Sequence, residues 1–217
     1  MTRAHFALAI GNFAVAMGAF TVLGLLRPLA DDLGVSIAVT GQLMTAYSVA
    51  YALGSPFLVV LSGTLARRSV VLLGLLLVAT GALLAAVSRD ATLLYASRVL
   101  GAFGAALYTP TAALIALTIS APERRMRGLA FVVGGLTLAQ IVGIPVATYI
   151  GGTIGWRWGM ALAAPIAFVG AAMVARMVPR EVPFHPPTFA GFGSALRDWR
   201  LLLTISVMAV MGSGQFM

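Results

Sequence analysis

Six long apolar stretches constrain this chain more than any other feature of its sequence. Each is close to the length that an α-helix needs to cross the hydrocarbon of a bilayer, roughly 20 residues. Their approximate limits are 6–26, 41–64, 70–87, 92–119, 129–150 and 158–178. Because only short polar segments separate them, the sequence predicts an all-α polytopic membrane protein whose first 178 residues form a six-helix transmembrane bundle.

A seventh apolar run covers 201–217 and is slightly shorter than the six before it. We expect it to be a truncated seventh transmembrane helix. The segment before it, 179–200, contains four prolines and charges of both signs. Such a composition is typical of a linker, and we place this one in the cytoplasm.

The chain has few charged residues for its size, which points to the solvent that surrounds it. Only 9% of its 217 residues are charged and 60% are hydrophobic, whereas about 25% charged residues is usual for a soluble domain. The net charge of +8 comes from arginines that stand singly or in pairs between apolar runs, as in membrane loops, so no nucleic-acid partner is expected. The absence of cysteine excludes disulfides and thiolate metal sites, and we expect no metal and no cofactor.

The distribution of arginine predicts the orientation of the chain, because cytoplasmic loops carry an excess of positive charge. With the N-terminus inside, ten arginines lie on the cytoplasmic side and four on the other. The ten are Arg3, Arg67, Arg68, Arg124, Arg125, Arg127, Arg176, Arg180, Arg197 and Arg200; the four are Arg27, Arg89, Arg98 and Arg157. We therefore expect a multi-pass protein of the inner (plasma) membrane with a cytoplasmic N-terminus, in which Arg67 and Arg68 anchor the second-to-third loop.

The sequence repeats itself at a fixed offset of 89 residues. The matched pairs are Gly54 with Gly143, Pro56 with Pro145, Gly63 with Gly152, and Thr64 with Thr153. Each repeat, about 1–90 and 91–178, contains three spans, so the two copies must be oppositely oriented in the membrane. Inverted repeats of this kind are typical of transporters.

Four segments together resemble one known family. They are LLRPLADDLGVS followed by GQLMTAYSVAYALGSP (25–56), ARRSVVLLG (66–74), RVLGAFGAALYTP (98–110) and GGLTLAQIVGIPVATYIGGTIGWR (134–157). The chain resembles the N-terminal half of a major facilitator superfamily transporter, in the branch of drug:proton antiporters and arabinose-efflux-permease-like sugar exporters. The resemblance implies half of a major facilitator fold, with two inverted three-helix repeats and the start of a seventh span.

Several positions depart from the pattern of that family. Its loop between helices two and three usually reads G-x-x-x-D-R-x-G-R-R, and Val59 and Gly63 replace the first glycine and the aspartate. In the family this aspartate helps to hold the outward-open state, and this chain lacks that acidic partner in the loop. The branch also often has an acid in helix one where this chain has Ala19.

All six carboxylates of the chain lie outside the predicted spans. Proton-coupled transport usually needs an ionisable group inside the membrane, so a proton-coupled protein would keep its titrating group in another half; otherwise it is a facilitator or an exchanger. Arg98 is the first residue of the segment RVLGAFGAALYTP in the fourth span. It lies about six residues into that helix, which at 1.5 Å per residue is roughly 9–10 Å below the outer boundary of the membrane. Two roles stay open for it, a side chain that reaches the outer interface and an arginine of the substrate pathway.

Polar and small residues within the spans are the remaining site candidates. As substrate-pathway candidates we take Asn12, Tyr47, Tyr51, Arg98, Tyr108, Thr109 and Gln140. Each of the uncharged ones is alternatively an interhelical hydrogen-bond partner. As gating or hinge candidates we take Arg67, Arg68, Gly101, Gly104, Gly143, Pro145, Gly151 and Gly152, and for the glycines the alternative is plain tight packing.

The predicted function is secondary active transport by alternating access, with export of a small drug-like or sugar compound and proton coupling left open. The expected partners are the small-molecule substrate, protons if coupling applies, the lipid bilayer, and a C-terminal six-helix half or a second copy. The alternatives are a half-length non-transporting assembly or binding module and a facilitator that works as a homodimer. The spans hold no cluster of Ser, His, Asp or Glu, so no enzyme is expected.

Overall fold

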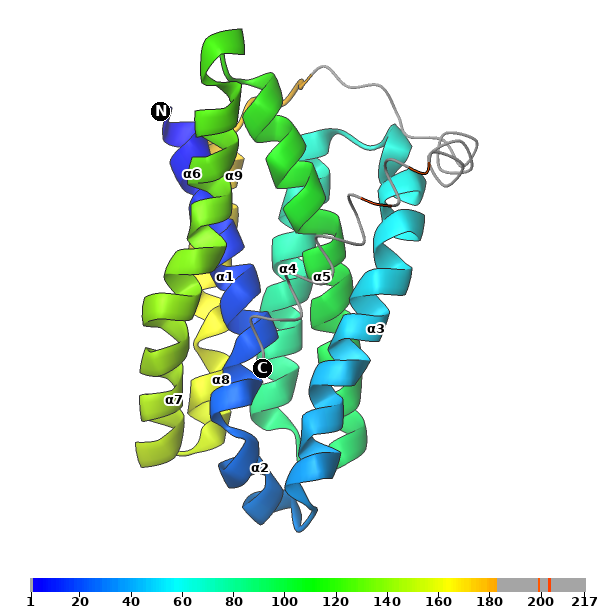
Figure 1. Cartoon of the computed structure of the whole chain (residues 1–217), viewed down its shortest axis with the longest axis vertical. Coiled ribbons are helices and arrows are strands. Elements are labelled where there is room, and N and C mark those ends of the chain that lie inside the picture. Colours follow the sequence, from blue (N-terminus) through cyan, green and yellow to red (C-terminus); the bar gives the residue numbers. More distant parts are fainter. Residues whose placement is uncertain (1, 183–198, 200–202, 204–217) are drawn as a thin grey trace. The chain divides into compact units, whose positions relative to one another are not determined.

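The computed structural model describes residues 2–182 and residues 199 and 203, and the described part is helical throughout its spans (Figure 1). Six helical segments in it are long and apolar enough to cross a membrane. The prediction of an all-α polytopic bundle is thus confirmed. Apart from residues 199 and 203, the predicted linker beyond residue 182 and the predicted seventh helix lie outside the described residues.

The first repeat contains three membrane-length helices and one short helix. Its elements are α1 (Arg3–Gly24), α2 (Leu26–Leu33), α3 (Ile37–Leu61) with the 3₁₀ turn Ser62–Thr64, and α4 (Arg67–Val87). The short helix α2 lies in the segment taken from the sequence as a loop. It ends at Gly34, whose φ of 64° is left-handed, and glycine adopts this conformation without a steric penalty.

The second repeat contains the same three membrane-length elements with two interruptions. Its elements are α5 (Ala91–Thr118), the 3₁₀ turn Pro122–Arg124, α6 (Arg125–Leu138), the π-helical segment Ala139–Gly143, α7 (Ile144–Thr153), α8 (Trp156–Ala161) and α9 (Ala163–Met177). The π-helical segment ends two residues before Pro145, which has no N–H to donate to a helix.

The offset found in the sequence also relates the helix boundaries. The first repeat's second span ends at Thr64 and the second repeat's at Thr153, while the third spans begin at Arg67 and Trp156; both pairs differ by 89. The packing follows the same relation, because α4 packs along α5 as α9 packs along α1, and α3 packs on α5 as α6 packs on α1. The inverted three-helix repeat predicted from the sequence is therefore present.

Close backbone contact between α4 and α5 holds the centre of the bundle together. A Cβ added at Gly104 would lie 2.6 Å from the carbonyl oxygen of Gly74, and one added at Gly74 would lie 2.8 Å from that of Gly104. A Cβ at Gly81 would lie 2.9 Å from the carbonyl oxygen of Ser97. Small residues permit such an approach in membranes, where packing rather than water drives helix association.

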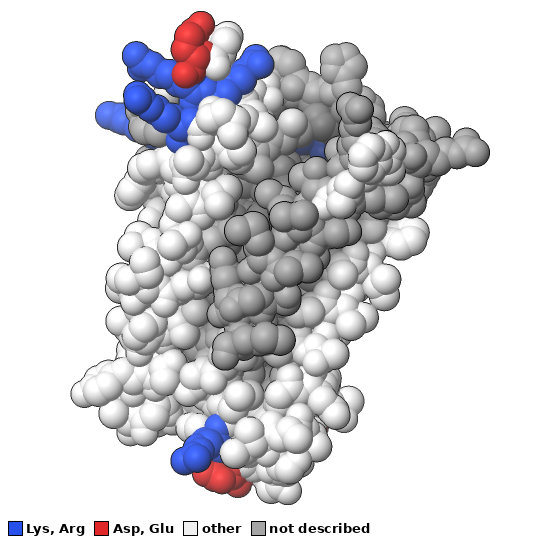
Figure 2. Space-filling view, in the orientation of Figure 1, with Lys and Arg blue, Asp and Glu red and all other residues white. Residues whose placement is uncertain are grey.

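The outer surface is apolar along the helices and charged at their ends. On the face shown in Figure 2, charged side chains of the described residues gather at the two ends, and none is seen in the band between them. Burial differs among the helices. Of the 18 most apolar consecutive residues in each span, 61% are buried in α1, 11% in the α3 span and 22% in the α6–α7 span. These two spans, which lie on opposite sides of α1 (Figure 1), therefore have the largest faces left for lipid or protein.

Candidate functional site

Arg98 occupies the centre of the candidate site and comes from α5. Its side chain is only 4% exposed, and it extends to α1, where Nη1 donates to the Gly18 carbonyl at 2.5 Å and Nη2 to the Ala19 carbonyl at 2.6 Å. The guanidinium also lies over the ring of Tyr47 from α3, 4.6 Å from its centroid. Arg98 thus joins three helices, and its guanidinium does not reach the outer surface.

The surroundings of Arg98 explain how a charge is tolerated there. Backbone carbonyls and an aromatic face both offer negative partial charge to a guanidinium. Placing an arginine at the centre of a span costs about 2.5–3.5 kcal/mol on insertion scales, so these contacts offset a substantial penalty. The Nε atom is buried and has no hydrogen-bond partner among the described residues, which leaves one donor for a water or a ligand.

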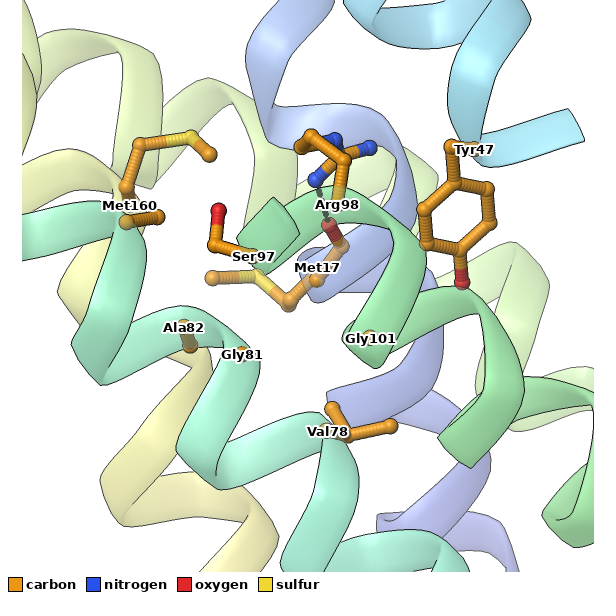
Figure 3. A pocket seen from close by; sticks show the side chains of 11 residues that line it. Met17, Tyr47, Val78, Gly81, Ala82, Ser97, Arg98, Gly101 and Met160 are labelled. Carbon is orange, nitrogen blue, oxygen red and sulfur yellow. Dashed lines mark hydrogen bonds between the residues drawn. The ribbon is translucent and has the colours of Figure 1, made fainter. Parts of the chain in front are cut away.

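A small cavity adjoins Arg98 (Figure 3). Its lining residues are Met17, Gly18, Tyr47, Val78, Gly81, Ala82, Ala85, Ser97, Arg98, Gly101 and Met160. The lining is mostly apolar, and the Ser97 hydroxyl donates to the Leu94 carbonyl at 2.6 Å. The space is near the lower limit for about one water molecule, so the guanidinium is the main group there that can recognise a polar ligand.

Asn12 and Tyr108 lie inside the bundle and do not line this cavity. Both are fully buried. The Asn12 amide donates to the Val132 carbonyl of α6 at 2.9 Å, and the Tyr108 hydroxyl donates to the Leu8 carbonyl of α1 at 2.9 Å. Of the two roles left open from the sequence, these contacts fit interhelical hydrogen bonding.

We expect Tyr108→Phe to lower the thermal stability of the purified protein without changing the charge of the bundle. A net intramolecular hydrogen bond contributes about 0.5–1.5 kcal/mol, and phenylalanine removes this one while keeping the ring. The measurement is the melting temperature in detergent, with Tyr149→Phe as the control because that side chain is 73% exposed. Equal melting temperatures for both variants would contradict the interhelical role.

The other pathway candidates are more accessible. Tyr51 and Thr109 are partly buried, and Gln140 is exposed within the π-helical segment. Gln140 therefore lies on one of the two least buried spans, and its amide needs a polar neighbour or water at membrane depth.

The two adjacent arginines of the second-to-third loop make separate contacts. Arg67 is buried, and its Nη2 donates to the Gly63 carbonyl at 2.9 Å. This contact stabilises the loop in which Arg67 lies. Arg68 donates to the Ala175 carbonyl near the end of α9. The structure therefore places this loop against the third span of the other repeat.

The glycine candidates separate by what surrounds them. Gly104 and Gly143 face close neighbours, and Gly151 faces the side chain of Leu25, whereas Gly152 has open space where a Cβ would stand. Gly101 is less crowded, with Tyr47 3.9 Å from the position of an added Cβ. Pro145 is exposed at the start of α7. Tight packing thus accounts for Gly104, Gly143 and Gly151, and a hinge role stays a proposal for the π-helical segment and Pro145.

Arg157 was not among the sequence-based candidates, although the repeat could have pointed to it. It lies 89 residues after Arg68, and its Nη2 donates to the Ser88 carbonyl at the end of α4, 3.1 Å away. It also forms an ion pair with Asp32 at 3.0 Å. The two repeat-related arginines therefore tie the third spans of the two repeats together at both ends.

Comparison with known proteins agrees with this architecture. The family model that describes the Major Facilitator Superfamily matches residues 8–217. The inner membrane transport protein YdhP of Escherichia coli (strain K12) is 31% identical over 174 residues, which cover 80% of this chain and 45% of that protein. The chloramphenicol resistance protein of Streptomyces lividans is 29% identical over 214 residues, covering 96% of this chain and 54% of that protein. The chain spans about half the length of these curated relatives.

Solved structures show the same fold. A peptide transporter POT in complex with sulfate has a TM-score of 0.74 at 16% identity, covering 100% of this chain and 48% of that one. The proton:xylose symporter XylE has a TM-score of 0.70 at 12% identity, covering 80% of this chain and 44% of that one. Fold and repeat together define a multi-pass membrane protein that has half of a major facilitator fold. The chain belongs to the Major Facilitator Superfamily.

Proposed function

We propose that this chain forms the N-terminal half of a secondary active transporter that works by alternating access and exports a small organic compound. The observation that carries the proposal is the inverted repeat, which lets a bundle take two pseudo-symmetric arrangements around a central path. The family match and the name of the chloramphenicol resistance relative support transport and efflux, respectively.

The two least buried spans carry matching stripes of small and polar residues. On α3 the stripe is Gly41, Thr45 and Ser48, and on α6 it is Ala130, Gly134 and Thr137. The members follow a spacing of four and three residues, which places them on one face of a helix, and each pair is related by the offset of 89. We call these two sets the small stripes.

Large apolar residues form a second pair of stripes on the same spans. On α3 they are Val49, Leu53 and Phe57, and on the α6–α7 span they are Leu138, Val142 and Val146, all between 47% and 63% exposed. They too are related by the offset of 89. Large apolar side chains are suited to lipid, whereas polar groups at membrane depth need protein or water, so we assign the small stripes to the boundary with a second bundle.

The second bundle in this proposal is the C-terminal half of the same protein, because curated relatives are about twice as long as this chain. A second copy of the chain is the alternative. No carboxylate lies between residues 33 and 89 or between residues 91 and 122. If the transport is driven by protons, the titrating group therefore belongs to the second bundle.

The test is flux of candidate compounds, beginning with chloramphenicol, into proteoliposomes that contain the whole protein, with and without a pH gradient. The proposal predicts saturable, protein-dependent flux, and a response to the gradient would show proton coupling. Saturable binding without flux would favour a non-transporting module and contradict the proposal.

The proposed cytoplasmic N-terminus has its own test, which the absence of cysteine simplifies. Ser69→Cys and Thr92→Cys place single thiols at exposed positions near opposite ends of the bundle. In intact cells a membrane-impermeant maleimide is expected to label Cys at position 92 and to leave position 69 unlabelled until the cells are opened. The reverse pattern would contradict the orientation.

A further inference from the structure

We propose that the site around Arg98 selects the substrate by charge, accepting anionic and neutral compounds and rejecting organic cations. This inference rests on the proposed transport function and names the substrate class for it. Its starting point is a buried cation that has one donor atom, Nε, without a partner among the described residues, and that faces a largely apolar lining.

Among the residues that the structure describes, no carboxylate forms an ion pair with Arg98. Its partners are two backbone carbonyls and the ring of Tyr47, which carry partial charges only. Asp32 is held by Arg157 at 3.0 Å, and the Asp90 carboxylate accepts from the Leu93 N–H at 2.8 Å as the cap of α5. Both of these acids are thus engaged at helix ends.

The positive field of Arg98 extends beyond its own cavity, because charges in a low-dielectric interior interact over longer distances than in water. A ligand therefore need not enter the small cavity to be sensed. The neighbouring α3 and α5 surfaces offer hydroxyl groups, including those of Tyr51 and Thr109, and no acid. A carboxylate or another acceptor is stabilised beside such a surface, whereas an ammonium or a pyridinium group meets an unscreened like charge.

The Nε atom adds a directional element to this preference. It is a donor without a partner among the described residues, so an acceptor brought to the site by a ligand would complete its hydrogen bonding. A cationic ligand has no acceptor that benefits in this way and leaves the donor unpaired, at an additional cost.

The experiment compares two xanthene dyes of opposite charge, fluorescein and rhodamine 123, for binding to the purified whole protein in nanodiscs of neutral lipid. We expect fluorescein to bind at least about tenfold more tightly, which corresponds to 1.4 kcal/mol. Binding is measured rather than flux, so a protein that does not transport can still show the charge preference. Equal affinities, absence of binding by both dyes, or tighter binding of rhodamine 123 would each overturn the inference.

A matched pair of variants tests whether Arg98 is the source of the preference. Met160 lines the cavity with Arg98 (Figure 3), and Met160→Glu would introduce a carboxylate there, whereas Met160→Gln introduces a neutral side chain of the same shape. Met160→Glu is expected to reduce the fluorescein preference to less than about threefold, and Met160→Gln is expected to retain it. Equal ratios in the two variants would show that the charge at this site does not set the preference.

Discussion

Replacing Arg98 with methionine is expected to remove at least nine-tenths of the transport activity while the protein still folds and inserts. Methionine fills similar space, and it removes the cost of placing an arginine inside a span, about 2.5–3.5 kcal/mol on insertion scales. What disappears is the pair of charge-assisted bonds to the Gly18 and Ala19 carbonyls of α1, each of a kind that contributes about 1.5–3 kcal/mol. Transport is measured as initial flux per folded molecule in proteoliposomes.

Arg98→Lys is the informative control for this variant. Lysine keeps the charge but lacks the planar fork that reaches two carbonyls at once, so partial flux is expected. Wild-type flux in Arg98→Met would contradict a role of the charge in transport and would leave Arg98 a packing residue.

Gly104→Val is expected to have a large effect on folding, because it disrupts the close packing of α4 against α5. The added Cβ would stand 2.6 Å from the Gly74 carbonyl oxygen and 2.7 Å from the Val78 backbone nitrogen. Backbone atoms cannot rotate away as side chains do, so α4 and α5 must separate. Overpacking alone usually costs about 1–3 kcal/mol, and loss of this helix contact adds to it.

The measurement is the amount of monodisperse protein recovered in detergent and its melting temperature. Gly152→Val is the matched control, because a Cβ there meets nothing within 4 Å and the residue is not part of the small stripes. Normal recovery of Gly104→Val would show that the helices can move apart at little cost and would contradict the proposed tight crossing.

The spans, the repeat and the fold were predictable from the sequence because a membrane imposes a length and an apolar composition on every crossing segment. The interruption at Ala139–Gly143 was not, since a π-helical turn leaves no apolar pattern of its own. The same holds for α2, whose sequence LRPLADDL contains charges and a proline that favoured a loop assignment.

The candidate site was predictable in its residue types but not in its contacts. An arginine in an apolar span is conspicuous, yet its partners Gly18 and Ala19 contribute only backbone oxygens, which no side-chain pattern marks. In the sequence, Asn12 and Tyr108 cannot be told from cavity-lining residues, because both kinds are polar residues within apolar spans. Only the packing shows that they donate hydrogen bonds to the carbonyls of Val132 and Leu8. Arg157 was overlooked because its loop position suggested topology alone.

The central claim is that the small stripes border a path that opens to one side of the membrane at a time. Gly41 and Ala130 are repeat-related members of these stripes, and they lie near opposite ends of the bundle, at the starts of α3 and α6. A Cβ added at Gly41 would have no other atom within 4 Å, and Ala130 is exposed. Val49 and Leu138, from the large apolar stripes, provide lipid-facing controls.

The decisive measurement is the rate at which a water-soluble maleimide labels Gly41→Cys and Ala130→Cys in the whole protein, with and without a saturating transported compound. The account predicts reciprocal changes, with labelling rising at one position when it falls at the other, and slow, constant labelling of Val49→Cys and Leu138→Cys. Rates at positions 41 and 130 that change in the same direction, or that match the lipid-facing controls, would contradict it.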